Sequence, residues 1–135
     1  WLAPRLSGDQ RGNLWAMLGT IEEKERNLDA ATSAYLEAEE RGSAHARVNA
    51  VRAIGALQDR EAALKQAREW VRSGEGSPRL IMELAVLEYQ HGNAQACLDA
   101  LSMDALVAYE EWADRLRSQR TRCEDLQREM NASPG

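Results

Sequence analysis

The residues of this chain best suited to chemistry are its two histidines and two cysteines, of which His91 and Cys97 lie closest together. A zinc site needs three or four protein ligands, and no other cysteine or histidine lies near this pair in the sequence. A cysteine nucleophile needs a neighbouring base and an electropositive setting. We therefore predict no metal, cofactor or catalytic site here. We interpret Cys97 as a packing residue and His91 as part of a turn that ends a helix.

The acidic residues are numerous, but their spacing is not that of an acid–base site. Glu22 with Arg26, and Glu61 with Lys65, are four residues apart, as on the exposed faces of helices. No two carboxylates lie within an apolar stretch that would separate their pKa values. The glycine-containing stretch 73–78 lacks the lysine of a phosphate-binding loop. We therefore predict that the chain is not an enzyme.

Charge and hydropathy limit the partners that the chain can have. The net charge is −5, and phosphate backbones are normally bound by basic surfaces, so we predict no nucleic-acid partner. We interpret the basic stretch 115–122 as an exposed helix face. No apolar run reaches the roughly 18–20 residues that span a bilayer, so we predict no direct membrane insertion. We expect residues 1–11 to be a linker or the end of a preceding element of a larger protein.

Composition and periodicity predict an all-α fold. Alanine and leucine dominate the apolar residues, and prolines occur only at positions 4, 78 and 134. Apolar residues recur at three- and four-residue steps, as on one face of a helix. The first two such stripes are Leu14, Trp15, Leu18 and Ile21, and then Leu28, Ala31, Tyr35 and Ala38. Asn27 suits a left-handed turn between these two helices.

Two further helix pairs follow. The third and fourth helices flank a turn at Gln58 and Asp59. Ser77 is predicted to cap the fifth helix, with Pro78 at its first position, where the missing N–H costs nothing. His91 and Gly92 supply the turn before the sixth helix. The pairs recur with a period of about 34 residues, which is typical of helical repeat proteins.

The residues at fixed places in these pairs carry a family resemblance. The first pair has Trp-x2-Leu-Gly followed by Ala31, Tyr35 and Ala38, and the third places Leu84, Ala85, Gly92, Cys97 and Leu101 in corresponding positions. On these residues, the chain resembles the tetratricopeptide repeat family over residues 12–104. The resemblance implies a right-handed superhelical solenoid of antiparallel helix pairs, with repeats at 12–43, 44–77 and 78–103. Small residues would lie where paired helices approach most closely.

Residues 104–130 are predicted to form one long helix, with Asp104 as its N-cap, that covers the end of the solenoid. Tyr109, Leu116, Cys123 and Met130 lie seven apart, so an alternative is self-association through a coiled coil. Cys97 and Cys123 could pair, which would imply an oxidising compartment such as a periplasm, or both could be free thiols in a cytosolic protein. Residues 131–135 are predicted to be a frayed tail.

The resemblance also implies a function. In this family the first helix of each repeat lines a concave groove that binds a segment of a partner protein, and nine residues carry over to that surface: Asn13, Thr20, His45, Val48, Arg52, Arg79, Met82, Val86 and Tyr89. We predict a protein partner whose acidic or amphipathic segment pairs with Arg52 and Arg79 over the apolar residues.

Two alternatives to a binding groove are open on the sequence: a structural spacer within a longer repeat array, and a module that self-associates through residues 104–130. The alanine- and arginine-rich composition of the repeats is similar to that of repeats in bacterial envelope proteins, including secretion and exopolysaccharide-export scaffolds. Cytoplasmic regulators carry the same repeats, so the sequence does not decide between periplasm and cytoplasm, although it favours the former.

Overall fold

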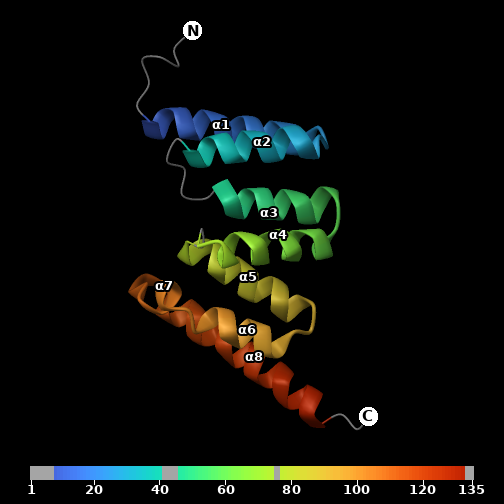
Figure 1. The fold of residues 1–135 in the computed structure, drawn as a ribbon, viewed down its shortest axis with the longest axis vertical. Helices are drawn as coiled ribbons and strands as arrows, with labels where there is room; N and C mark the ends of the chain where they lie inside the picture. The colour runs from blue at the N-terminus through green and yellow to red at the C-terminus, as the bar shows by residue number, and fades with distance from the viewer. Residues whose placement is uncertain (1–7, 41–45, 75–76, 133–135) are drawn as a thin grey trace. The chain divides into compact units, whose positions relative to one another are not determined.

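The computed structural model describes residues 8–40, 46–74 and 77–132, with the side chains of residues 8–13 excepted. All regular secondary structure in these ranges is helical, which confirms the all-α prediction. The helices are α1 (Gly8–Lys24), α2 (Leu28–Glu40), α3 (Ala46–Leu57), α4 (Arg60–Arg72), α5 (Pro78–Gln90), α6 (Ala94–Leu101), α7 (Asp104–Val107), the 3-10 helix η2 (Glu110–Trp112) and α8 (Ala113–Ala132) (Figure 1). None of the helices described is long and apolar enough to cross a membrane.

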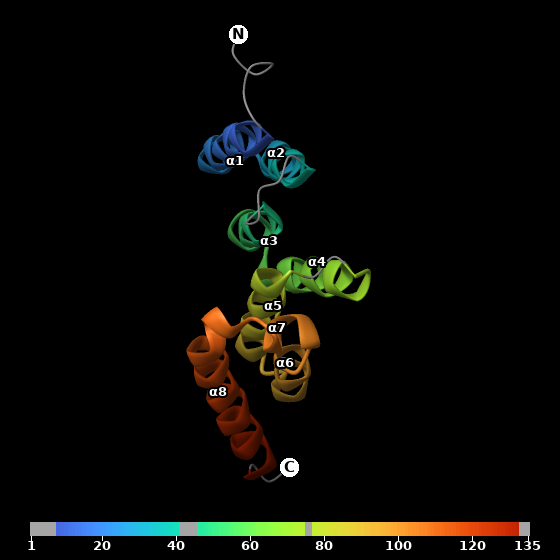
Figure 2. The same cartoon turned by 90° about the vertical axis from the view of Figure 1, so that its left-hand side faces the viewer.

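The chain forms two compact units, residues 1–63 and 64–135. The division lies inside α4 and therefore within the second predicted repeat. In the first unit, α1 and α2 form a helical hairpin, and α3 packs against α2 (Figure 1). In the second unit, α5 and α6 form a hairpin, and α8 packs mainly against α6 and also against α5 (Figure 2).

The α1–α2 hairpin depends on one small residue, Gly19. A Cβ atom at this position would lie 2.6 Å from ring carbons of Tyr35, closer than real Cβ contacts allow. Tyr35 is only 2% exposed, and its hydroxyl donates a hydrogen bond to Glu23 at 3.0 Å. Glycine here therefore lets a buried aromatic ring lie directly against the α1 backbone.

The turn between α1 and α2 differs from the prediction. Arg26, rather than Asn27, has the left-handed conformation, with φ of 61°. Its N–H bonds the carbonyl of Glu23, and the N–H of Asn27 bonds the carbonyl of Glu22, which is the hydrogen-bond pattern of a Schellman helix end. Asn27 instead accepts a hydrogen bond from the backbone N–H of Ala30 at 3.4 Å, so it caps the start of α2.

The start of α5 and the turn after it agree with the prediction. The Ser77 side chain accepts a hydrogen bond from the N–H of Leu80 at 3.2 Å, and Pro78 is the first helical residue. After α5, Gly92 has a φ of 76°, which a larger residue would resist. The His91 ring nitrogen Nδ1 lies 2.9 Å from the carbonyl oxygen of Leu87, so this imidazole serves the helix end.

The prediction of one long helix over residues 104–130 is wrong. The chain forms the four-residue α7, the single turn η2 and the twenty-residue α8, and Met103 rather than Asp104 is the N-cap of α7. Leu106 is fully buried on α7, which packs against α5, while Tyr109 has a non-helical backbone. After burying Leu106, the chain reverses direction, so that α8 packs back along α6.

A disulfide joins Cys97 of α6 to Cys123 of α8, with Cα atoms 6.1 Å apart. Of the two sequence interpretations of these cysteines, the structure therefore has the paired one. Both cysteines are fully buried. The residues predicted to form a coiled-coil seam therefore do not share one free helix face. Tyr109 lies before α8, and Cys123 faces the chain's own α6.

Candidate functional site

The structure places the nine predicted groove residues in different settings. His45 lies outside the described residues, and the side chain of Asn13 is not described. Thr20 and Arg52 are exposed in the first unit, and the Thr20 hydroxyl donates to the carbonyl of Ala16 at 3.1 Å. Val48 is only 6% exposed, so it belongs to the apolar core instead of an open wall. The other four, which are Arg79, Met82, Val86 and Tyr89, lie half-buried on α5 of the second unit.

Two of these residues line a hollow of about 370 Å³ between α5 and α8. We call this space the α5–α8 hollow. Met82 and Val86 form its α5 wall, and its α8 wall consists of Asp114, Arg115, Ser118, Gln119 and Arg122. The predicted groove face of α5 therefore faces α8 across the hollow. Residues 104–130 were predicted to cover the end of the solenoid or, alternatively, to self-associate. Two arginines against one aspartate make this hollow locally cationic.

Arg79 lies against the aromatic residues that precede α8. Its guanidinium carbon is 5.2 Å from the centroid of the Trp112 ring, and that of Arg115 is 5.4 Å from the same ring. Tyr109 packs edge-on against Trp112, with ring centroids 5.4 Å apart. Cation–π contacts of this kind contribute on the order of 1 kcal/mol each. Arg79 thus shares an aromatic ring with Arg115, one of the residues that line the α5–α8 hollow.

The α8 wall of this hollow is joined to α6 by the disulfide. Gln119 and Cys123 are the only α8 residues that are buried, and the rest of the described helix is half-buried or exposed. The amide group of Gln119 points at the sulfur atoms, 3.6 Å from Cys123 and 3.9 Å from Cys97. One exposed hydrogen bond of 2.8 Å, from Gln127 to Gln95, also joins α8 to α6. Because little of α8 is buried, we expect the covalent link to contribute strongly to holding it against α6.

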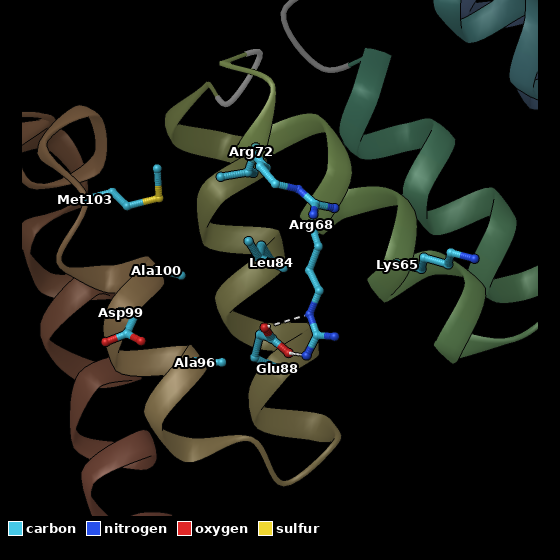
Figure 3. A pocket seen from close by; sticks show the side chains of 10 residues that line it. Lys65, Arg68, Arg72, Leu84, Glu88, Ala96, Asp99, Ala100 and Met103 are labelled. Atoms are coloured by element: carbon cyan, nitrogen blue, oxygen red, sulfur yellow. Dashed lines mark hydrogen bonds and ion pairs between the residues drawn. The ribbon is translucent and has the colours of Figure 1, made fainter.

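A second hollow, of about 650 Å³, lies between α4, α5 and α6 (Figure 3). We call this space the α4–α6 hollow. Three cations from α4 lie along one side, the carboxylates of Glu88 and Asp99 lie on α5 and α6, and the remaining lining is apolar: Val71, Leu84, Ala96, Ala100 and Met103. The three cations are Lys65, Arg68 and Arg72.

A buried carboxylate organises this second hollow. Glu88 is 4% exposed, and Arg68 binds it in two places, Nε to Oε2 at 3.0 Å and a terminal nitrogen to Oε1 at 2.5 Å (Figure 3). The side-chain amide of Asn93 donates to the same Oε1 at 3.0 Å. The hydrogen bonds to Glu88 raise the pKa of Arg68, which therefore stays charged. The guanidinium group of Arg68 and the amide group of Asn93 thus compensate the buried Glu88 carboxylate with hydrogen bonds.

The α4–α6 hollow was missed in the sequence, because only the first helix of each pair was expected to line a groove. A signal was nevertheless present. Lys65, Arg68 and Arg72 recur at three- and four-residue steps, which places them on one face of α4.

Among the residues that the structure describes, no group of three His, Cys, Asp or Glu side chains could hold a metal ion.

Comparisons with known proteins give this chain no family. No protein-family model matches the sequence, and no curated protein and no solved structure matches it significantly. The helix pairs and the two hollows are therefore the basis on which a function can be proposed.

Proposed function

We propose that the chain is a non-catalytic protein-interaction scaffold, built from helix pairs of tetratricopeptide type, that binds a partner segment in the α5–α8 hollow. The observation that carries the proposal is the position of Met82 and Val86. These two apolar side chains stay half-buried on an open wall, opposite the cationic side chains of Arg115 and Arg122. A segment with apolar and acidic residues is complementary to such a surface.

The setting that we propose is a larger assembly of the bacterial envelope, such as a secretion or polysaccharide-export complex. The Cys97–Cys123 disulfide supports an oxidising compartment, since disulfides persist there and are rare in the cytosol.

The test is a selection of binding peptides from a displayed random library, followed by affinity measurements on two double variants. Met82→Gln/Val86→Thr adds polar atoms to the hollow with little change in volume. Met130→Gln/Val107→Thr makes the same chemical changes at two exposed positions outside it. We expect a group of the selected peptides to bind the first variant at least tenfold more weakly and the second variant as they bind the wild type.

A second candidate function, a structural spacer between further helix pairs, has one specific observation in its favour. Leu14, Met17, Leu18 and Ile21 form an apolar stripe on α1 that is 39% to 61% exposed. A stripe of this kind is typical of a helix that packs against another repeat. The same selection separates the two functions, because a spacer predicts that no selected peptide depends on Met82 and Val86.

A further inference from the structure

We propose that the α4–α6 hollow is a second binding site, which takes an acidic, amphipathic segment of a partner protein. It shares no lining residue with the α5–α8 hollow. The proposal rests on the cations of α4 and the apolar floor beneath them, and it holds whether or not the α5–α8 hollow binds anything.

Two of the three cations along α4 are available to a ligand. Arg68 is committed to the buried Glu88. Lys65 and Arg72 line the same hollow, Lys65 at its edge with its ammonium group directed away from Leu84 (Figure 3), and no described residue forms a side-chain hydrogen bond or ion pair with the side chain of either. They are seven residues apart, so they lie about 10 Å from each other along the helix axis at 1.5 Å per residue. Leu64 and Ala67 of the same helix are buried and hold it in place.

The other residues that line the α4–α6 hollow are unfavourable for a ligand that binds through charge alone. Its floor is apolar, with Leu84 and Ala100 buried and Met103 half-buried at one end (Figure 3). On the α6 side, Asp99 accepts a hydrogen bond from Gln95 at 2.9 Å and presents a negative charge. A nucleic acid carries a phosphate at every step, which does not suit a hollow that offers two available cations and the negative charge of Asp99.

An amphipathic segment matches this distribution. Its carboxylates must face Lys65 and Arg72, and its apolar side chains must face Leu84 and Met103. A separation of about 10 Å corresponds to positions i and i+7 on one face of a helix. On an extended strand, where alternate side chains share a face, the nearest spacings are about 7 Å for i and i+2 and about 13 Å for i and i+4. Charge-assisted bonds to the two cations would supply orientation, and the apolar floor would supply most of the buried area.

The experiment uses the whole chain and a displayed library of random peptides, each about 12 residues long to span the two cations in either conformation. We expect the selection to enrich peptides that carry acidic residues together with apolar ones. Synthetic copies are then measured by fluorescence anisotropy against Lys65→Glu/Arg72→Glu, and we expect at least a tenfold loss of affinity. The matched control, Lys24→Glu/Arg60→Glu, makes the same charge change at exposed positions outside the hollow and should stay within twofold of the wild type.

Two further variants keep the result interpretable. Lys65→Gln/Arg72→Gln removes the charges without adding carboxylates and should lose affinity in the same direction. Because selection on the whole chain can yield peptides for either hollow, the peptides followed here are those that Met82→Gln/Val86→Thr, which alters only the α5–α8 hollow, binds as the wild type does. Failure of one site is then distinguishable from failure of the other.

Several outcomes would overturn the proposal. These are enrichment of neutral or basic peptides, no enrichment at all, or equal binding by Lys65→Glu/Arg72→Glu and the wild type. A single-stranded oligonucleotide is measured in parallel. If it binds more tightly than the peptides and needs Lys65 and Arg72, the site is one for nucleic acid and our assignment is wrong.

Discussion

The first unit of the chain packs largely through alanines, whereas the second packs through leucines, a disulfide and a buried ion pair. Six of the ten buried residues of α2 and α3 are alanines, with Tyr35 as the one large ring among them. In the second unit, Leu80, Ile81, Leu101 and Leu106 are fully buried, and Cys97–Cys123 ties two helices together.

This difference has consequences for where ligands can bind. Small residues let helices approach closely and fill space without gaps. Larger side chains, and a polar helix such as α8 that is attached by a disulfide, leave hollows between helices. Both the α5–α8 hollow and the α4–α6 hollow lie in the second unit. Both of the binding sites that we propose therefore belong to the second unit.

The largest effect on this comparison should come from removing the disulfide. We expect Cys97→Ala/Cys123→Ala to lower the free energy of unfolding of the second unit by about 3 kcal/mol, since the bond joins cysteines 26 residues apart. Amide hydrogen exchange should accelerate along α8 and stay unchanged in α2. Reduction of the wild type should give the same pattern, and slow exchange in α8 after reduction would show that its other contacts hold it.

An intermediate effect is expected from Gly19 in the first unit. Gly19→Ala places a Cβ against the buried Tyr35 ring, and we expect a net destabilisation of about 1–2 kcal/mol after the gain in helix propensity. Gly55→Ala is the matched control, because its Cβ would lie 3.6 Å from that of Ala63, an ordinary contact. Thermal unfolding of the two variants makes the measurement, and equal melting temperatures would contradict a tight fit at Gly19.

The smallest effect is a pH dependence confined to the first unit. Burial, together with the nearby Glu23, raises the pKa of Tyr35 above its ordinary value of 10.0, although the hydrogen bond with Thr20 acts in the opposite direction. The unfolded tyrosine loses its proton near pH 10 while the folded one keeps it. Stability should therefore be intact below about pH 10 and fall as the pH rises further.

Hydrogen exchange in α2 between about pH 8 and pH 11, a range that brackets the ordinary tyrosine pKa, measures this dependence. Tyr35→Phe should remove the part due to ionisation. A variant that shows the same alkaline loss as the wild type would assign the effect to other groups.

Local signals in the sequence predicted much of the fold. Ser77 with Pro78, and His91 with Gly92, mark helix ends through their own backbone chemistry, so the sequence alone located them. The break after α7 has no such mark, because it depends on burying Leu106 against α5. A tertiary contact of this kind is not visible in the spacing of residues.

The candidate site was less predictable than the fold. The spacing of Met82 and Val86 placed both on one helix face, and the structure places both in one hollow. Val48 fits the same pattern but is buried, since periodicity identifies a face and not what covers it. The Arg68–Glu88 pair joins residues twenty positions apart on two helices, and only the packing of α4 against α5 could reveal it.

The central proposal is that partner segments bind the second unit, in the α5–α8 hollow or the α4–α6 hollow. The most direct measurement is amide hydrogen exchange of the whole chain with and without a saturating selected peptide. We predict slower exchange in α4, α5 or α8 and no change in α1 to α3. Protection of α1 to α3 with none in α4 to α8 would contradict the claim.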